Sequence, residues 1–140
     1  MTLAIWPLRP SYDLNGTNGG PQSNRVSFAT ESGIPIERPK YTAELELWNI
    51  ITEPVERREA NIFAAWYRDT VFSGALPFIL THPMTDAFGR WKIIDASPPY
   101  TIQPISYELV TLRFQALKLP NPVDQLAYFI TADGRIEAMP

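Results

Sequence analysis

Cysteine is absent from this sequence of 140 residues, and its absence excludes several kinds of chemistry. A chain without thiols forms no disulfide framework, no thiolate metal site and no cysteine nucleophile. Histidine is scarce as well, because His82 is the only one. A metal site would need His82 together with carboxylates, and a Ser-His-Asp triad would have a single candidate base. We therefore predict no catalytic residue, no cofactor and no metal, and we interpret His82 as part of a solvated loop.

A strong charge of one sign and long hydrophobic runs are also lacking. Twelve basic and 15 acidic residues give a net charge of −3, which disfavours a nucleic-acid partner because binding to phosphates needs a basic surface. No stretch approaches the roughly 18 apolar residues of a membrane-spanning helix, and the first ten residues do not resemble a secretory signal. We expect no sequence-specific nucleic acid and no membrane, and a protein that stays in the cytosol where it is made or enters an assembly there.

Proline, by contrast, is plentiful. The 14 prolines favour turns and extended segments over long helices, and an apolar content of 45% is enough for a folded core. We expect a single domain over residues 1–140. Within it, residues 1–24 form an extended arm and a loop, residues 25–119 form the core, and residues 120–140 form a C-terminal extension.

Alternation of apolar and polar residues predicts several strands. They cover residues 25–30, 41–50, 90–94, 100–103 and 106–117. A further strand over residues 76–81 contains Pro77, which suits a sheet edge. In the strand over residues 41–50, Leu45 and Leu47 share one face, and Trp48 and Ile50 add apolar bulk to the other. A terminal hairpin is expected between residues 125 and 140, with its turn at Asp133 and Gly134.

One helix is expected over about residues 53–71. Thr52 or Glu53 can cap it, and Pro54 falls in the first turn, where its missing N–H costs nothing. Its apolar stripe consists of Val55, Ile62, Phe63 and Trp66. The predicted fold class is α+β and mainly β, a β-sandwich or split barrel with one flanking α-helix.

Specific residues support two alternatives to a structural function. A small carbohydrate-binding β-module would use exposed aromatic rings, with Trp48, Trp91 and Tyr100 as candidates. A hydrolase would use paired carboxylates, with Glu44, Glu46 and Glu108 as candidates. The first alternative requires exposure of the three rings, and the second requires two of the carboxylates to face each other across a cleft.

The order of features over residues 25–117 resembles a known family. It is carried by Arg25-Val26-Ser27-Phe28, a glycine-containing turn, Arg38-Pro39, the alternating strand from Tyr41 to Leu47, a helix rich in Glu and Arg, the segment from Trp66 to Gly74, Pro77-Phe78, Trp91, and the strand from Val110 to Phe114. This order is similar to that of the phage minor tail protein family that includes minor tail protein M of phage lambda. It also resembles the wider group of distal tail and tail tube proteins.

The resemblance implies a structural virion protein located in the phage tail, which forms a ring between the tail tube and the baseplate or tip hub. Its expected partners are further copies of itself in a ring, hexameric by analogy with the family, the tail tube protein, the tip or baseplate hub proteins and the tape measure protein. The candidates for the subunit interface are aromatic and apolar residues in three places: Trp6 and Tyr12 in the arm, Met84 and Phe88 in the hairpin-like loop, and Tyr128 and Phe129 near the end.

Overall fold

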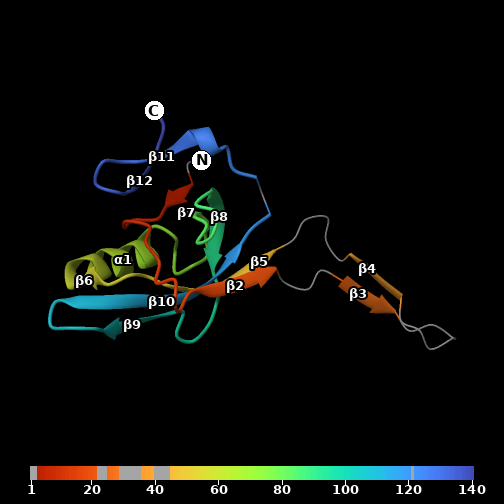
Figure 1. Ribbon diagram of the computed structural model, residues 1–140, viewed down its shortest axis with the longest axis horizontal. Helices are drawn as coiled ribbons and strands as arrows, with labels where there is room; N and C mark the ends of the chain where they lie inside the picture. The colour runs from red at the N-terminus through yellow and green to blue at the C-terminus, as the bar shows by residue number, and fades with distance from the viewer. Residues whose placement is uncertain (1–2, 22–24, 29–35, 40–44, 121) are drawn as a thin grey trace.

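The computed structural model describes residues 3–21, 25–28, 36–39, 45–120 and 122–140. Its main body is one mixed sheet of eight strands with one helix against it (Figure 1), which confirms the α+β, mainly β, fold class. Six strands follow the order β1-β7-β8-β10-β5-β2, and β6 and β9 pair with β10 outside that path. These eight strands are β1 (Ala4–Ile5), β2 (Asn18–Pro21), β5 (Glu46–Ile51), β6 (Val55–Glu56), β7 (Phe78–Thr81), β8 (Phe88–Ile93), β9 (Tyr100–Pro104) and β10 (Leu109–Lys118).

Two further pairs of strands lie outside this sheet. β3 (Arg25–Phe28) and β4 (Ile36–Pro39) form one antiparallel pair, which Figure 1 draws well away from the body. At the C-terminus, the 3-10 helix η1 (Gln125–Ala127) leads into β11 (Tyr128–Ile130), which pairs with β12 (Ile136–Ala138). The predicted terminal hairpin is therefore confirmed. Residues 29–30 and 41–44 of the predicted strands lie outside the described residues.

Strand β10 is the centre of the sheet because other strands pair with it along both of its edges. One edge pairs with β5 over Arg113–Lys118 and with β6 at Leu109 and Val110. The other edge pairs with β8 and β9, and all four pairings are antiparallel. Val110, Thr111 and Leu112 are all buried, so both faces of the strand are covered here. The strand begins only at Leu109, which explains why Tyr107 does not fit its alternation.

Helix α1 spans Arg57–Asp69 and is shorter than predicted at its N-terminal end. Thr52 does not cap it, because the Thr52 hydroxyl accepts a hydrogen bond from the Leu112 amide and the Thr52 amide donates to the Leu112 carbonyl. Val55 and Glu56 pair with β10 as strand β6 instead. Tertiary hydrogen bonding thus outweighed the capping signal. The buried face of the helix is Ala60, Phe63 and Trp66, whereas Ile62 is exposed, contrary to the predicted stripe.

The N-terminal arm is an integral part of the body. Ala4 and Ile5 pair in parallel with β7, and the Trp6 amide donates to the Ile79 carbonyl. β7 therefore lies between β1 and β8, and the prediction of an edge strand is wrong because Pro77 precedes the paired residues. The segment predicted as a flexible loop likewise contains β2, which pairs with β5.

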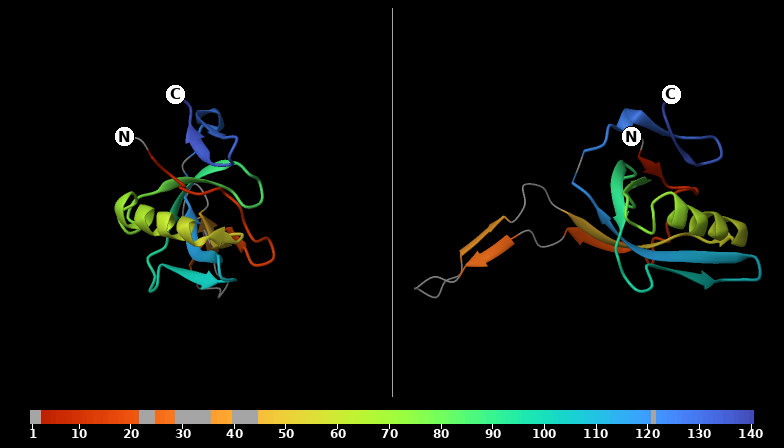
Figure 2. Two further views of the ribbon diagram at one scale, coloured as in Figure 1. Left: turned by 90° about the vertical axis from the view of Figure 1, so that its left-hand side faces the viewer. Right: turned by 180° about the vertical axis from the view of Figure 1, so that it is seen from behind.

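The core lies between the sheet and the helix (Figures 1 and 2) and is rich in aromatic rings. Trp6 occupies its middle, with ring centroids 5.3–6.0 Å from those of Phe63, Trp66, Phe78 and Phe114. β5 contributes Trp48 and Ile50, which are buried, while Leu47 is only partly so. The buried face of β5 is thus the one on which the sequence places Trp48.

Candidate functional site

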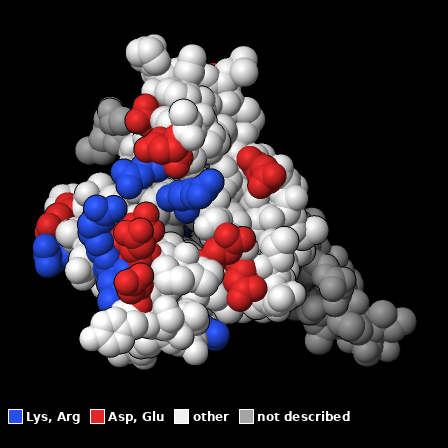
Figure 3. Space-filling model, turned by 60° about the vertical axis from the view of Figure 1, so that its left-hand side comes forward, with Lys and Arg blue, Asp and Glu red and all other residues white. Residues whose placement is uncertain are grey.

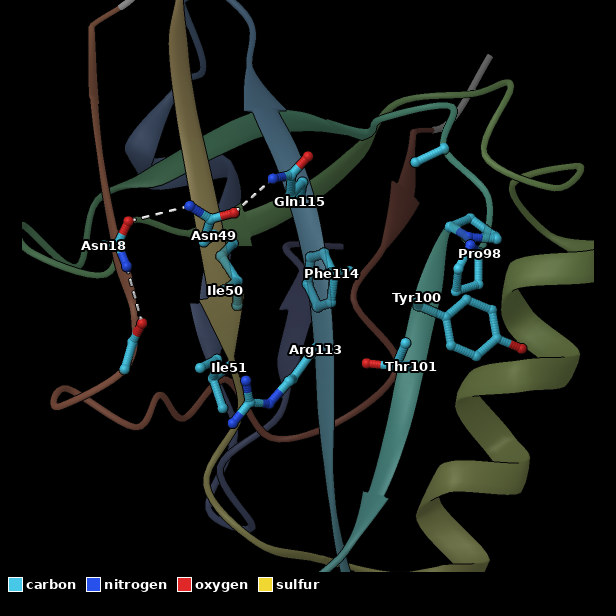
Figure 4. A pocket seen from close by; sticks show the side chains of 13 residues that line it. Asn18, Asn49, Ile50, Ile51, Pro98, Tyr100, Thr101, Arg113, Phe114 and Gln115 are labelled. Atoms are coloured by element: carbon cyan, nitrogen blue, oxygen red, sulfur yellow. Dashed lines mark hydrogen bonds between the residues drawn. The ribbon is translucent and has the colours of Figure 1, made fainter.

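A groove of about 370 Å³ with a mixed polar and apolar lining lies over β2, β5, β9 and β10 (Figure 4). Its floor contains three amide side chains in one row across the sheet, because Asn49 lies opposite Asn18 on one side and opposite Gln115 on the other. Gln115 Nε2 donates to Asn49 Oδ1 at 2.8 Å, and Asn49 Nδ2 donates to Asn18 Oδ1 at 3.1 Å. The row ends where Asn18 Nδ2 donates to the Gly16 carbonyl.

The next row of the groove floor adds a cation. Arg113 lies opposite Thr101 of β9 and opposite Ile51 of β5, and its guanidinium is exposed. The volume falls in the range of small-molecule sites. Each side-chain amide of the row has one N–H that makes no hydrogen bond within the row, and Gln115 Oε1 accepts none there. The Arg113 guanidinium adds further hydrogen-bond donors. This surface can hydrogen-bond an uncharged polar group or a single anion.

A second polar cluster surrounds His82, which is only 6% exposed. Its Nδ1 accepts the Met84 amide hydrogen at 3.0 Å, so Nε2 carries the ring hydrogen and donates to Glu46 Oε1 at 3.0 Å. Trp48 Nε1 donates to the same oxygen, and Lys118 Nζ lies 3.6 Å from Glu46 Oε2. The interpretation of His82 as a solvated loop residue is therefore wrong, because Glu46 supplies a partner inside the fold.

The carboxylate in this cluster is held ionised. Partial burial acts to raise the pKa of Glu46, but the hydrogen bonds from His82 and Trp48, together with nearby positive charge, outweigh it and leave the pKa below its ordinary value. All the contacts of this carboxylate favour its charged form. The cluster therefore has the chemistry of a structural ion pair, in contrast to a general acid, which needs a raised pKa.

The hydrolase alternative does not find its geometry among the described residues. Glu44 lies outside them. Glu46 is opposite Lys118 at one end of β10, while Glu108 is exposed just before its other end. A strand of this length separates them by about 30 Å at the usual rise per residue, whereas catalytic carboxylate pairs are about 5–10 Å apart.

The carbohydrate platform is also missing. Trp48 and Trp91 are buried, and the Tyr100 ring packs edge-on against Phe63 and Tyr67 beside the helix. Strand alternation places an aromatic residue on one face of a sheet but does not show whether another element covers that face, so the sequence cannot distinguish exposed rings from buried ones. Here helix α1, the N-terminal arm and the His82 loop cover them.

The six residues predicted as interface candidates divide into two groups. Trp6 is 3% exposed in the core, and Tyr12 is partly buried with its hydroxyl donating to the Thr81 carbonyl at 2.5 Å. The structure assigns both to the interior of this chain, because the arm pairs with its own sheet. Burial also raises the pKa of Tyr12, although its contact with Thr81 acts the other way.

The other four candidates remain partly or fully accessible. Met84 is 78% exposed at a loop tip, and Phe129 is exposed on the C-terminal hairpin. Phe88 and Tyr128 are partly buried against each other, with ring centroids 5.8 Å apart. Met84 and Phe129 thus have free surface for a partner, while Phe88 and Tyr128 use theirs chiefly for a contact inside the chain.

A group of exposed apolar residues at the β9–β10 turn was not predicted from the sequence. We call Ile102, Ile105 and Tyr107 the tip patch, and Tyr107 is 94% exposed. Arg57 holds this turn: its Nε donates to the Tyr107 carbonyl at 2.7 Å and its Nη2 to the Ser106 carbonyl at 3.2 Å. The available signal was the failure of Tyr107 to fit the strand alternation.

A second group of exposed apolar residues belongs to the C-terminal hairpin, which we define as residues 122–140. We call this group the terminal patch, and it consists of Leu126, Phe129, Ile130 and Met139. The β9–β10 turn and the C-terminal hairpin, which carry the two patches, lie on different sides of the body (Figures 1 and 2). The molecule therefore has two separate apolar surfaces.

Charge is mixed on the surface that Figure 3 shows. Lys and Arg side chains lie directly beside Asp and Glu side chains, and wide uncharged areas lie above and below them. Nucleic-acid-binding faces instead gather Lys and Arg into a stripe or patch. This face does not have that distribution.

Comparisons with protein-family models, with curated proteins and with solved structures found no match to this chain. In the part of the chain that the structure describes, no helix is long and apolar enough to cross a membrane. The described residues also contain no group of three or more His, Asp or Glu side chains placed to hold a metal ion. The geometry of the site itself is therefore what supports a function.

Proposed function

We propose that this chain is a structural subunit of the tail of a long-tailed bacteriophage. In this proposal it is a ring-forming minor or distal tail protein that links the tail tube to the baseplate or tip hub. The resemblance over residues 25–117 supports the phage assignment, and the mainly β fold with one flanking helix agrees with what that resemblance implies.

The observation that carries the proposal is the presence of two different apolar patches on one chain. Exposed large side chains gathered into patches mark contacts with other proteins. When one patch of a subunit binds a different patch of the next, the contact is heterologous and repeats around a ring if the rotation closes. The tip patch and the terminal patch meet this requirement, because the turn and the hairpin that carry their exposed residues lie on different sides of the body.

The tip patch has the features of an interface anchor. Tyrosine is enriched among the residues that dominate binding energies, and Tyr107 presents nearly all of its surface. The two hydrogen bonds from Arg57, together with the Arg57 amide donating to the Glu108 carbonyl at 3.2 Å, fix the turn before any partner arrives. A contact made by an ordered turn loses less conformational entropy on binding.

The mild negative charge is compatible with a place beside passing DNA. The net charge of −3 gives no attraction that would retain a polyanion in a tail channel. Reversal of acidic residues that face the channel should slow DNA delivery, and an unchanged delivery rate would count against this part of the proposal.

The test is the position of the protein in intact particles, determined by cryo-electron microscopy together with its copy number. A ring at the end of the tail tube is the expected result. In solution, Tyr107→Ala should weaken self-association by about tenfold or more, measured by sedimentation across a concentration series. Leu14→Ala is the matched control, because Leu14 is exposed but belongs to neither patch. Absence of the protein from particles would overturn the proposal.

A further inference from the structure

The groove over β2, β5, β9 and β10 contains one charged side chain, that of Arg113, among the described residues that line it. Its guanidinium is exposed, and no carboxylate of the described residues lies within ion-pair distance of it. Ile51 and Thr101, which lie opposite Arg113 on the two neighbouring strands, are uncharged. Acidic residues outnumber basic ones 15 to 12 in the whole chain, yet the described lining of this groove has none. The local charge therefore favours an anion that brings one negative charge.

The amide row beside Arg113 presents more hydrogen-bond donors than acceptors. Its three hydrogen bonds all run in one direction, from Gln115 to Asn49, from Asn49 to Asn18, and from Asn18 to the Gly16 carbonyl. Asn49 Oδ1 and Asn18 Oδ1 each accept one of these bonds, whereas every side-chain amide retains a second N–H. Gln115 Oε1 is the one amide oxygen of the row that accepts no hydrogen bond from a described residue. The row therefore matches a ligand that carries several acceptor oxygens.

The polar groups of the groove are held in place before any ligand binds. The row lies across paired strands, so the backbone positions of its amides are fixed by the ladders of β2, β5 and β10 (Figure 4). Side chains that are already ordered lose less conformational entropy on binding, and hydrogen bonds in a chain strengthen one another. Ile51 and Pro98 add apolar surface to the lining. The groove therefore combines ordered donors with a surface for a short carbon chain.

We propose that this groove binds a small monocarboxylate that also carries hydroxyl groups. Arg113 pairs with the carboxylate, the remaining N–H groups of Asn49 and Gln115 donate to hydroxyl oxygens, and Gln115 Oε1 accepts a hydroxyl hydrogen. A ligand with two negative charges fits less well, because the groove has one cation and the second charge would lose water without gaining a partner. This binding goes beyond the proposed structural function and does not depend on it.

Titration of the full chain with D-gluconate, followed by NMR of the side-chain amide groups, tests the proposal. Gluconate should shift the amide signals of Asn49 and Gln115 with a Kd of about 1 mM, as expected for a small ligand in an open groove. Two matched probes separate the parts of the ligand. Sorbitol has hydroxyl groups but no carboxylate, and acetate has a carboxylate but no hydroxyl group. Both should bind at least about tenfold more weakly than gluconate.

Two pairs of variants assign the binding to the groove. Arg113→Gln should weaken gluconate binding by about tenfold or more, because it removes the partner of the carboxylate. Arg135→Gln is the matched control, since it removes the same charge from an exposed position outside the groove and should bind as the wild type does. Asn49→Ala interrupts the row at its middle and should weaken binding severalfold, whereas Asn61→Ala, at an exposed position on α1, should not.

The outcomes are distinct. Binding that is lost in Arg113→Gln and kept in Arg135→Gln, with shifts at the row, supports the site. Equal loss in both arginine variants would show attraction by net charge alone and overturn it. The site is also overturned if gluconate leaves the amide signals of Asn49 and Gln115 unmoved, or if acetate or sorbitol binds as tightly as gluconate. None of these results bears on ring formation, so this inference and the proposed function can fail separately.

Discussion

The two ends of the chain differ in how they join the body. The N-terminal arm adds strands to both outer edges of the sheet and places Trp6 among four aromatic rings of the core. The C-terminal hairpin forms its own small sheet and docks through Gln125, Tyr128 and Ile136. One end completes the core, and the other is attached to it. Sequence composition did not separate them, since both carry prolines, glycines and large apolar residues.

The largest expected effect is at Trp6. Trp6→Ala should lower the free energy of unfolding by about 3–5 kcal/mol, because it leaves a cavity between the helix and the sheet. Chemical denaturation followed by fluorescence would measure it. Tyr107→Ala is the matched control, as a fully accessible aromatic outside the core, and should change stability by less than about 0.5 kcal/mol. A small effect at Trp6 would mean that the arm is not part of the core.

Ile136→Ala tests the C-terminal hairpin and should lower the free energy of unfolding by about 2 kcal/mol. This is a small loss for a buried isoleucine, because the docked hairpin can move into the space left by the side chain. Hydrogen exchange should show faster exchange of the hairpin amides with the β10 amides unchanged. If amide exchange became equally faster throughout the body, the contrast between the two ends of the chain would be wrong, because the hairpin would then unfold in the same cooperative unit as the core.

Gln125→Ala should lower the free energy of unfolding by about 1 kcal/mol, a smaller effect. It removes two hydrogen bonds, but the Phe88 amide and carbonyl can then hydrogen-bond to water. The measurement is the exchange rate of the Phe88 amide, which should rise while that of Trp91 on the same strand does not. Gln125→Glu is a useful comparison, because it keeps an acceptor for the Phe88 amide but loses the donor to the Phe88 carbonyl.

Tyr12→Phe should have the smallest effect at neutral pH, below about 1 kcal/mol for the loss of one hydrogen bond. The informative measurement on this variant is how its free energy of unfolding depends on pH. The pKa of Tyr12 is raised in the folded state, so wild-type stability from this group is fully present below its ordinary pKa of 10.0 and is lost as pH rises beyond it. Between pH 8 and pH 11, the free energy of unfolding should therefore fall less steeply in Tyr12→Phe than in the wild type. Identical slopes would contradict the assignment.

How much of this structure the sequence predicts depends on whether a residue's environment is local. Strands β5, β8, β9 and β10 follow from alternation, and the terminal hairpin follows from its turn at Asp133 and Gly134. Strands β1, β2 and β6 were not predicted. The burial of His82 does not, because its partner Glu46 lies 36 residues away. The start of the helix fails for the same reason, since Thr52 bonds to Leu112, which is 60 residues away.

The candidate site was predictable only in part. Met84 was predicted from its place in a hairpin-like loop and Phe129 from its place near the C-terminal end, and both are exposed. Trp6 was predicted from its place in the arm and is buried, because the arm pairs with β7. The residues next to Trp6 give no sign of that pairing. The amide row of Asn18, Asn49 and Gln115 depends on the registers of three strands, which single-sequence patterns do not fix.

Strand β10 sets the order in which this protein can fold during synthesis. Four strands depend on it for hydrogen bonds, and all four precede it in the chain. Its pairing with β5 closes a long loop, which is slow compared with the adjacent β9–β10 hairpin. The sheet therefore stays incomplete until residue 118 has left the ribosome. Until then β5 and β8 have unpaired edges, and these edges are where a nascent chain at high concentration would associate wrongly.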